Sequence, residues 1–318
     1  MLKMKKIFLV GTLAAASLFT FTGCLKDKDF ENQKYGTQIR EMKGVAFPEA
    51  ASGPLAVSVT SSSTSQTIDG ATIVLEQDGN AASDVQVTLQ INNALVTAAG
   101  LTPLPTTAFS IVGGNTVTIP AGQKQVMVKL AFPNSAALSP TTSYGLGLTI
   151  SSVSGGYTIA KNQKDLVFSI SVKNLYDGIY SVVSGKVTRY TAPGTPANDA
   201  LSGNLAGNPD VKLITTGPNS VSIPAPATPN PGTIYWANGQ NSQVAGIDGL
   251  SLTINPSTNA VTVSSAGNAT LANWAGSTPG ITYNRYDPAT KTFYLAFRWN
   301  PTANVREYEI VLKYKGPR

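Results

Sequence analysis

The stretch Asp84–Ile91, with the sequence DVQVTLQI, alternates strictly between apolar and polar residues. Its valine, leucine and isoleucine residues fall on one face of an extended chain, and its glutamines and threonine fall on the other. Because successive side chains of a strand point to opposite faces, a period of two is typical of a half-buried β-strand. This stretch therefore predicts a strand with one face in a core.

Similar runs precede and follow this stretch, separated by Gly, Pro, Asn and Ser, the residues typical of turns. About seven runs in roughly 130 residues, with no long helical pattern, favour an immunoglobulin-like β-sandwich over residues 39–173. A short helical turn fits Asn93–Ala99. The other predicted strands are Leu55–Val59, Ala71–Glu76, Asn115–Pro120, Gln125–Leu130, Tyr144–Ile150 and Asp165–Val172.

A second strand-rich region begins near Lys173–Gly178 and predicts a C-terminal β-domain over residues 174–318, either a second β-sandwich or a barrel-like domain. Long loops are expected at Thr191–Asp210 and Pro224–Gly232, which are rich in proline or glycine. Hairpin loops at Asn255–Asn259 and Asp287–Thr290 separate the later strands. These strands are predicted at Leu250–Ile254, Ala260–Val263, Ile281–Tyr286, Thr292–Trp299 and Glu307–Tyr314.

The N-terminus is typical of an exported lipoprotein. Residues 1–23 carry three lysines and then the uncharged apolar segment Ile7–Phe21, which is short for a membrane span. Small residues then precede Cys24, the single cysteine of the chain. We therefore expect a lipid-modified Cys24, an anchor in the outer membrane, and a flexible tether over residues 24–38. The alternatives are a signal anchor, or ordinary cleavage beside an incidental cysteine.

Composition restricts the chemistry. The formal charge is +6, but three of the 23 Lys and Arg lie in residues 1–23, so the remainder carries 20 basic against 17 acidic residues, or +3. This charge predicts no nucleic-acid partner. The chain has no histidine and one cysteine, which excludes Ser-His-Asp and Cys-His catalysis and an intrachain disulfide. No cofactor is expected.

Two motifs resemble a known family. The segment Val117–Gln123, followed by an alternating strand, and the segment Asn174–Tyr180 are similar to Bacteroidetes surface lipoproteins with an N-terminal Calx-beta/adhesin-like domain of unknown function. Tyr286–Pro288, Lys291–Phe293 and Arg306–Glu307 resemble the C-terminal β-domain of these proteins.

The resemblance implies glycan binding beside SusC/SusD-like outer-membrane uptake systems, which are candidate partners. Acids just after Cys24 also resemble the signal that directs such lipoproteins to the cell surface, although lysines interrupt them, so the leaflet face stays open. Calx-beta domains bind calcium through clustered acids. The acids here are scattered, so a calcium site is not carried over.

Sugars stack on aromatic rings and hydrogen-bond to amides, so aromatic residues beside Asn and Gln are candidate ligands for a polysaccharide or oligosaccharide. The first candidate segment provides Tyr235, Trp236, Asn238 and Gln240. The alternative is that Trp236 belongs to the core.

Trp274 is the second candidate, because it lies among small polar residues. It could instead plug the end of the β-domain. Trp299 lies on an alternating apolar face with Phe293 and Phe297 and is predicted to be core.

Paired carboxylates are the remaining possibility for catalysis. The acids of residues 174–318 are explained without it, since Asp177 and Asp287 occupy turn contexts and Glu307 and Glu309 share the solvent face of a strand. No enzyme is therefore expected. The predicted function is non-catalytic carbohydrate binding. The alternative is a structural adhesin, or an accessory subunit that binds protein partners through exposed strand edges.

Overall fold

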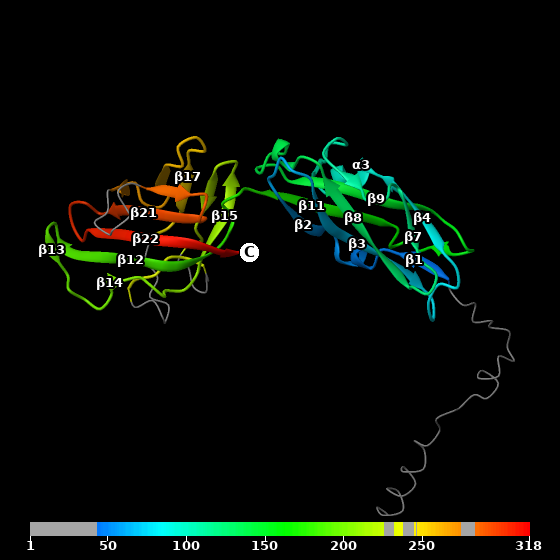
Figure 1. Cartoon of the computed structure of the whole chain (residues 1–318), viewed down its shortest axis with the longest axis horizontal. Helices are drawn as coiled ribbons and strands as arrows, with labels where there is room; N and C mark the ends of the chain where they lie inside the picture. The colour runs from blue at the N-terminus through cyan, green and yellow to red at the C-terminus, as the bar shows by residue number, and fades with distance from the viewer. Residues whose placement is uncertain (1–42, 226–231, 238–244, 246, 275–283) are drawn as a thin grey trace, which may run out of the picture. The chain divides into compact units, whose positions relative to one another are not determined.

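Figure 1 shows a computed structural model of the chain, which describes residues 43–225, 232–237, 245, 247–274 and 284–318. The predicted signal peptide, Cys24 and the tether lie outside these residues. Within the described ranges, no helix is both long enough and apolar enough to span a bilayer.

The buried hydrophobic residues form two large, separate cores. One is built from residues between Val45 and Val172, and the other from residues between Tyr176 and Leu312. The described residues are mainly strands, with one short α-helix and two 3-10 helices among them. This confirms the predicted all-β class. Residues 44–173 are called the N-terminal part below, and residues 174–318 the C-terminal part.

The N-terminal part consists of two sheets. One has the strand order β10-β1-β3-β8-β6, and the other has the order β2-β11-β9-β4-β7, with β5 beside β9. The strands are β1 Gly44–Ala46, β2 Leu55–Thr60, β3 Gln66–Glu76, β4 Val85–Ile91, β5 Thr102–Pro103, β6 Ser110–Ile111, β7 Thr116–Ile119, β8 Gln125–Phe132, β9 Tyr144–Val153, β10 Thr158–Ile159 and β11 Asp165–Lys173. The helices are η1 Pro48–Ser52, α3 Asn93–Ala98 and η2 Ser135–Ala137. The helical turn near Asn93 is thus confirmed.

Both sheets contribute to one core, which makes this part a β-sandwich. The alternation of DVQVTLQI is present in β4, where Val85, Val87 and Leu89 are buried while the two glutamines are exposed. Ile91 at its end is half-buried. From the other sheet, Leu75 and Leu130 are fully buried in the same core.

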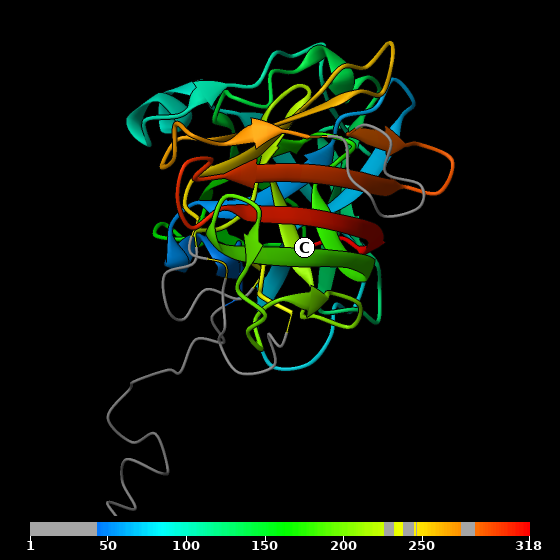
Figure 2. The same cartoon turned by 90° about the vertical axis from the view of Figure 1, so that its left-hand side faces the viewer.

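The C-terminal part is one large sheet with the order β18-β17-β16-β15-β12-β22-β21-β19, to which β13, β14 and β20 are added. Figure 2 shows β12 (green), β22 (red) and β21 (orange-brown) side by side. The strands are β12 Gly178–Ala192, β13 Thr195–Pro196, β14 Gly203–Asn204, β15 Val211–Gly217, β16 Ser220–Ser222, β17 Leu250–Ile254, β18 Val261–Ser265, β19 Ala272–Asn273, β20 Arg285–Asp287, β21 Thr292–Trp299 and β22 Arg306–Gly316.

This sheet curls until its two ends meet, so it is nearly a closed barrel, as the barrel-like alternative predicts. At the seam, Asn273 receives a hydrogen bond from the Val263 N–H (2.8 Å) and donates one to the Val263 carbonyl (2.9 Å). Asn284 donates to Asn273 (2.8 Å), and its carbonyl accepts from the Val261 N–H (2.9 Å). Two asparagine side chains therefore take part in joining β18 to the far end of the sheet.

The segment Thr191–Asp210 differs from the prediction of a long loop. β12 continues to Ala192, and β13 and β14 both pair with it. Pro193 and Gly194 form the turn between β12 and β13, where their backbone geometry is suited, while Pro196 and Gly203 lie within β13 and β14. The expectation of an irregular loop was therefore wrong over part of its length.

The motif at Asn174–Tyr180 has a structural role. The Asn174 amide donates to the carbonyls of Gly217 and Ser220, and its oxygen accepts from the Tyr176 N–H. Tyr180 is fully buried and its hydroxyl donates to the Tyr176 carbonyl (3.0 Å). These bonds fix the start of β12 against the β15–β16 turn.

Candidate functional site

Three neighbouring strands, β12, β22 and β21, give the C-terminal part an inner and an outer face. Alternate residues of β21 point inward, and Phe293, Phe297 and Trp299 are buried in the barrel core, as predicted for Trp299. The outer face carries the intervening residues, among them Tyr294 and Arg298. A binding site for a large ligand has to be sought on this outer face or at the ends of the barrel.

Trp236 lies at the inner face. It is 9% exposed, and its ring centroid lies 6.2 Å from that of Trp299 and 5.7 Å from that of Tyr308. The Arg189 guanidinium lies over the ring, 5.0 Å from its centroid. This is the core placement that the sequence left open, and it leaves the ring without an open face for a sugar.

Tyr235 is half-buried, and its carbonyl accepts a hydrogen bond from the Tyr308 hydroxyl. Burial raises the pKa of Tyr308 well above its usual value, so this hydroxyl keeps its proton and remains a donor. Asn238 and Gln240 lie outside the described residues. Of the four candidates in this segment, the structure therefore places two, and it places both against the barrel core.

Trp274 lies on the outer face. It follows β19, its N–H donates to the Ala296 carbonyl (3.1 Å), and its half-buried side chain packs on a small cluster with Ala296 and Val311. It is not part of the main core. Because Trp236 contacts the inner face of β21 and Trp274 its outer face, the two predicted tryptophans do not form one site.

A hollow of about 240 Å³ lies near the outer face, at the end of the barrel where β12 and β22 meet. Tyr190, Arg298 and Glu307 provide its polar groups, and the Tyr190 hydroxyl donates to Glu307 Oε2 (2.9 Å). Its apolar walls come from the turns that follow β12 and β21. They are formed by Pro193, Pro301 and Val305.

Trp274 does not line the hollow, but it lies on the same face of β21. Trp274 is bonded to Ala296, which precedes Arg298 by two residues on β21, a distance of about 6.6 Å along a strand. Both residues point to the outer face. An aromatic ring, a guanidinium, a carboxylate and a phenol are thereby gathered on one surface, which we call the outer site.

The electrostatics of the outer site follow from burial and from two hydrogen-bond networks. Burial, and then the hydrogen bond to Glu307, raise the pKa of Tyr190, so the phenol stays protonated and remains a donor. Arg306 Nη1 donates to the carbonyls of Tyr190 (3.0 Å), Asn304 (2.7 Å) and Val305 (3.0 Å). Arg306 therefore shapes the backbone of the hollow.

Glu309 corrects one expectation. It lies on the same outer face as Glu307, but it is 1% exposed and Lys186 Nζ lies 3.7 Å from its Oε1. Its register neighbour Ala296 is also buried, and Trp274 packs on the same cluster. Glu309 is therefore not a solvent-facing residue as predicted.

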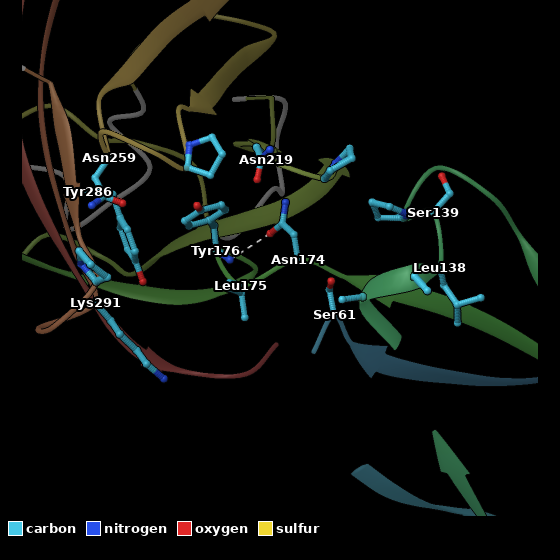
Figure 3. Close-up of a pocket in the computed structure, with 16 residues that line it drawn as sticks. Ser61, Leu138, Ser139, Asn174, Leu175, Tyr176, Asn219, Asn259, Tyr286 and Lys291 are labelled. Carbon is cyan, nitrogen blue, oxygen red and sulfur yellow. Dashed lines mark hydrogen bonds between the residues drawn. The ribbon is translucent and has the colours of Figure 1, made fainter. Parts of the chain in front are cut away.

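A second group of polar and aromatic residues lies at another edge of the C-terminal part (Figure 3). Tyr176 and Tyr286 meet edge to face, with centroids 5.0 Å apart, and Lys291 Nζ lies 5.0 Å from the centre of the Tyr314 ring. Burial raises the pKa of Tyr286 to about 12. Since Tyr176 and Tyr286 are largely buried and belong to the barrel core, this group is structural.

The described residues contain no group of three or more His, Cys, Asp or Glu side chains arranged to hold a metal ion. Asp177 and Asp287 have structural partners: Asp177 accepts from the Thr215 N–H (2.8 Å), and Asp287 from the Ala289 N–H (3.0 Å). The bond of Asp287 agrees with its predicted turn role, whereas the carboxylate of Asp177 binds strand β15 and not its own turn.

The sequence does not distinguish Tyr190 or Arg298 as ligands. The alternation of β21 puts Arg298 on the face opposite Phe297 and Trp299, and this is the available signal. The sequence could not pair Tyr190 with Glu307, because 117 residues separate them and the register of β12 against β22 is set by the whole sheet.

Comparison with known proteins agrees with this fold. A family model with the description "-like, N-terminal domain" matches residues 40–156. No curated protein matches the chain significantly.

Solved structures give several matches. A Bacteroides ovatus protein of unknown function matches with a TM-score of 0.50 and 13% identity over 87% of this chain and 95% of its own. An auxiliary nutrient binding protein from Bacteroides thetaiotaomicron matches with a TM-score of 0.38 and 13% identity, over 81% of this chain and 90% of its own. A Bacteroides ovatus protein provisionally described as a carbohydrate binding protein matches with a TM-score of 0.32 and 16% identity, over 85% of this chain and 80% of its own. At these identities the likeness concerns the fold alone.

Proposed function

We propose that this protein is a non-catalytic carbohydrate-binding lipoprotein and that its outer site holds the glycan. The observation that carries the proposal is the position of Trp274, which is half-buried on the outer face and bonded through its backbone to Ala296, two residues before Arg298 on β21. The ring offers an apolar face to the CH groups of a sugar, while the hollow on the same face of the barrel offers hydrogen-bonding groups for the hydroxyls.

The size of the hollow suits one ring of a longer ligand and not a whole drug-sized ligand. Pockets for drug-sized ligands measure about 300–1,000 Å³, and the hollow is smaller, at about 240 Å³. It is suited to one ring of a chain whose neighbouring rings lie over the open face toward Trp274. Binding of this kind needs positioned side chains and no general base, which agrees with a chain that lacks histidine.

The proposed location rests on the N-terminal sequence. A lipid-modified Cys24 would hold the protein at the outer membrane, and the tether 24–38 would give the β-domains reach from the lipid surface. Such an arrangement is suited to capturing glycans for a SusC/SusD-like uptake system. Radiolabelled palmitate incorporated by the wild-type chain and absent from Cys24→Ala would support the anchor.

The glycan role is tested with the full chain purified in detergent. Native affinity gels containing plant, host and microbial polysaccharides should retard the wild type in one glycan class, and Trp274→Ala should abolish the retardation. Leu175→Ala is a matched control, because Leu175 is 65% exposed and remote in sequence from the outer site. Unchanged migration across the whole panel would contradict the proposal and favour the adhesin or accessory-subunit alternative.

A further inference from the structure

Arg298 is the unusual residue of the outer site. It is exposed, and it lies directly across from Glu307 in the β21–β22 register. Opposite charges at such a position commonly pair, yet no ion pair or hydrogen bond joins Arg298 to another side chain in the part of the chain that the structure describes. Its guanidinium thus remains available to a ligand.

Glu307 is engaged elsewhere. One of its oxygens accepts the Tyr190 hydroxyl at 2.9 Å, and burial keeps that phenol protonated. The carboxylate therefore makes its hydrogen bond to Tyr190 and none to Arg298 in the described residues, and its own negative charge stays in the hollow.

The lining of the hollow carries one guanidinium, that of Arg298, and one carboxylate, that of Glu307. Arg306 does not line it, because its Nη1 is directed at backbone carbonyls and its guanidinium lies near Arg189 and Asp199, which form an ion pair of their own. Recognition of an anion in the hollow therefore depends on the forked donors of Arg298 and not on a surplus of positive charge.

Resting on the carbohydrate-binding function proposed above, we infer that the hollow binds a carboxylate-bearing sugar, such as a uronic or sialic acid, through Arg298. A guanidinium binds a carboxylate through two parallel N–H donors, a geometry that an ammonium group lacks. The proline and valine walls provide contact for the ring of the sugar, and Trp274 contacts the next ring along the chain.

The test compares each ligand with its own neutral form. Dissociation constants of the full chain in detergent are measured at about 0.15 M salt for oligogalacturonate, oligomannuronate and a sialylated oligosaccharide. The same three are measured after their carboxyl groups are reduced to alcohols. We expect at least one acidic form to bind about tenfold or more tightly than its reduced form, because only the carboxylate forms charge-assisted hydrogen bonds with the guanidinium. The oligosaccharide that shows this preference identifies the class of acidic sugar.

Substitutions test whether Arg298 is the side chain that binds the carboxylate of the sugar. Arg298→Gln should remove the preference for the acidic form, and Arg298→Lys should restore only part of it, because the forked geometry is lost. Lys313→Gln is the control, since Lys313 is an exposed cation on β22. Thermal unfolding should be unchanged in all three variants.

Several results would overturn the inference of an acidic ligand, and they distinguish its failure from a failure of the proposed carbohydrate binding. Equal binding of acidic and reduced forms, still lost in Trp274→Ala, would refute the acidic ligand while supporting carbohydrate binding. Equal weakening by Arg298→Gln and Lys313→Gln would show general charge attraction and would also refute it. Absence of binding to all six oligosaccharides and to the neutral polysaccharide panel would refute both.

Discussion

Arg318 and Asp177 form a two-point ion pair, with Arg318 Nε 2.9 Å from Asp177 Oδ1 and Nη2 3.0 Å from Oδ2. The Asp177 side chain is only 2% exposed and also accepts the N–H and hydroxyl of Thr215, at 2.8 and 2.9 Å. One carboxylate thus connects the start of β12, the strand β15 and the segment after β22.

Asp177→Asn should therefore destabilise the C-terminal part by about 1.5–3 kcal/mol, the usual value of hydrogen bonds to a charged group. Urea unfolding would measure the loss. The control is Asp69→Asn, because the Asp69–Lys129 pair is exposed and such pairs contribute about 0–1 kcal/mol. Equal effects of the two substitutions would contradict the role given to Asp177.

Gly185→Ala should destabilise the barrel by more than about 2 kcal/mol. Gly185 has φ +130°, and a Cβ there would lie 2.1 Å from the Glu309 carbonyl oxygen in the neighbouring strand. Gly207→Ala is the matched control, because Gly207 has φ +79° but open space around it, so it tests backbone conformation alone. We expect a cost of about 1 kcal/mol for Gly207→Ala, and thermal unfolding of the two variants compares them.

Trp236→Ala should mainly lower stability, whereas Trp274→Ala should mainly weaken glycan binding. Trp236 is packed among the rings of the barrel core, so its removal should cost about 3–5 kcal/mol in unfolding free energy. Trp274 lies in a small outer cluster, so its removal should cost much less and should act on glycan binding. Denaturant unfolding and affinity gels on both variants check this, and a stable Trp236→Ala protein would show that its ring is not a core residue.

Alkaline pH should destabilise the C-terminal part through its buried tyrosines. Burial raises the pKa of Tyr286 to about 12, whereas an unfolded tyrosine has a pKa near 10. Below pH 10 both states hold the proton. Between pH 10 and 12 the unfolded state loses it first, so the free energy of unfolding falls as pH rises.

Tyr286→Phe has no proton to release at this position, so its stability should decline less steeply over the same interval. Urea midpoints from pH 9 to 11.5 measure the slopes. Tyr157→Phe, a substitution beside the other core, serves as the control. If the urea midpoint fell equally steeply with pH in Tyr286→Phe and in the wild type, the loss of stability could not be assigned to the raised pKa of Tyr286.

Local patterns predicted the strands well, because the period of two in β4 and β11 is set by which face each side chain occupies. The same patterns predicted the core position of Trp299. They could not predict the partners of a strand, so Tyr190 and Glu307 were not brought together. They also could not distinguish an outer-face residue that is covered from one in solvent, which is why Glu309 was misplaced.

Trp236 illustrates a further limit. Aromatic residues beside amides are typical of sugar sites and also of strands that enter a core, and the two cases share one local sequence. The decision depended on Trp299 and Tyr308, which lie more than sixty positions away. Motifs of this kind indicate where aromatic side chains gather, while the fold decides which of their faces stays open.

The seam of the barrel has a consequence for local unfolding. Between β12 and β22 a long ladder from Ile179 to Arg189, with two shifts of register, joins the strands, whereas the seam depends on the side chains of Asn273 and Asn284 and a few backbone bonds. A short set of bonds opens at a lower free energy than a long ladder. In native-state hydrogen exchange, the amides of Val261 and Val263 should therefore exchange before those of β22. The barrel should open transiently at this seam while the rest of the sheet stays paired.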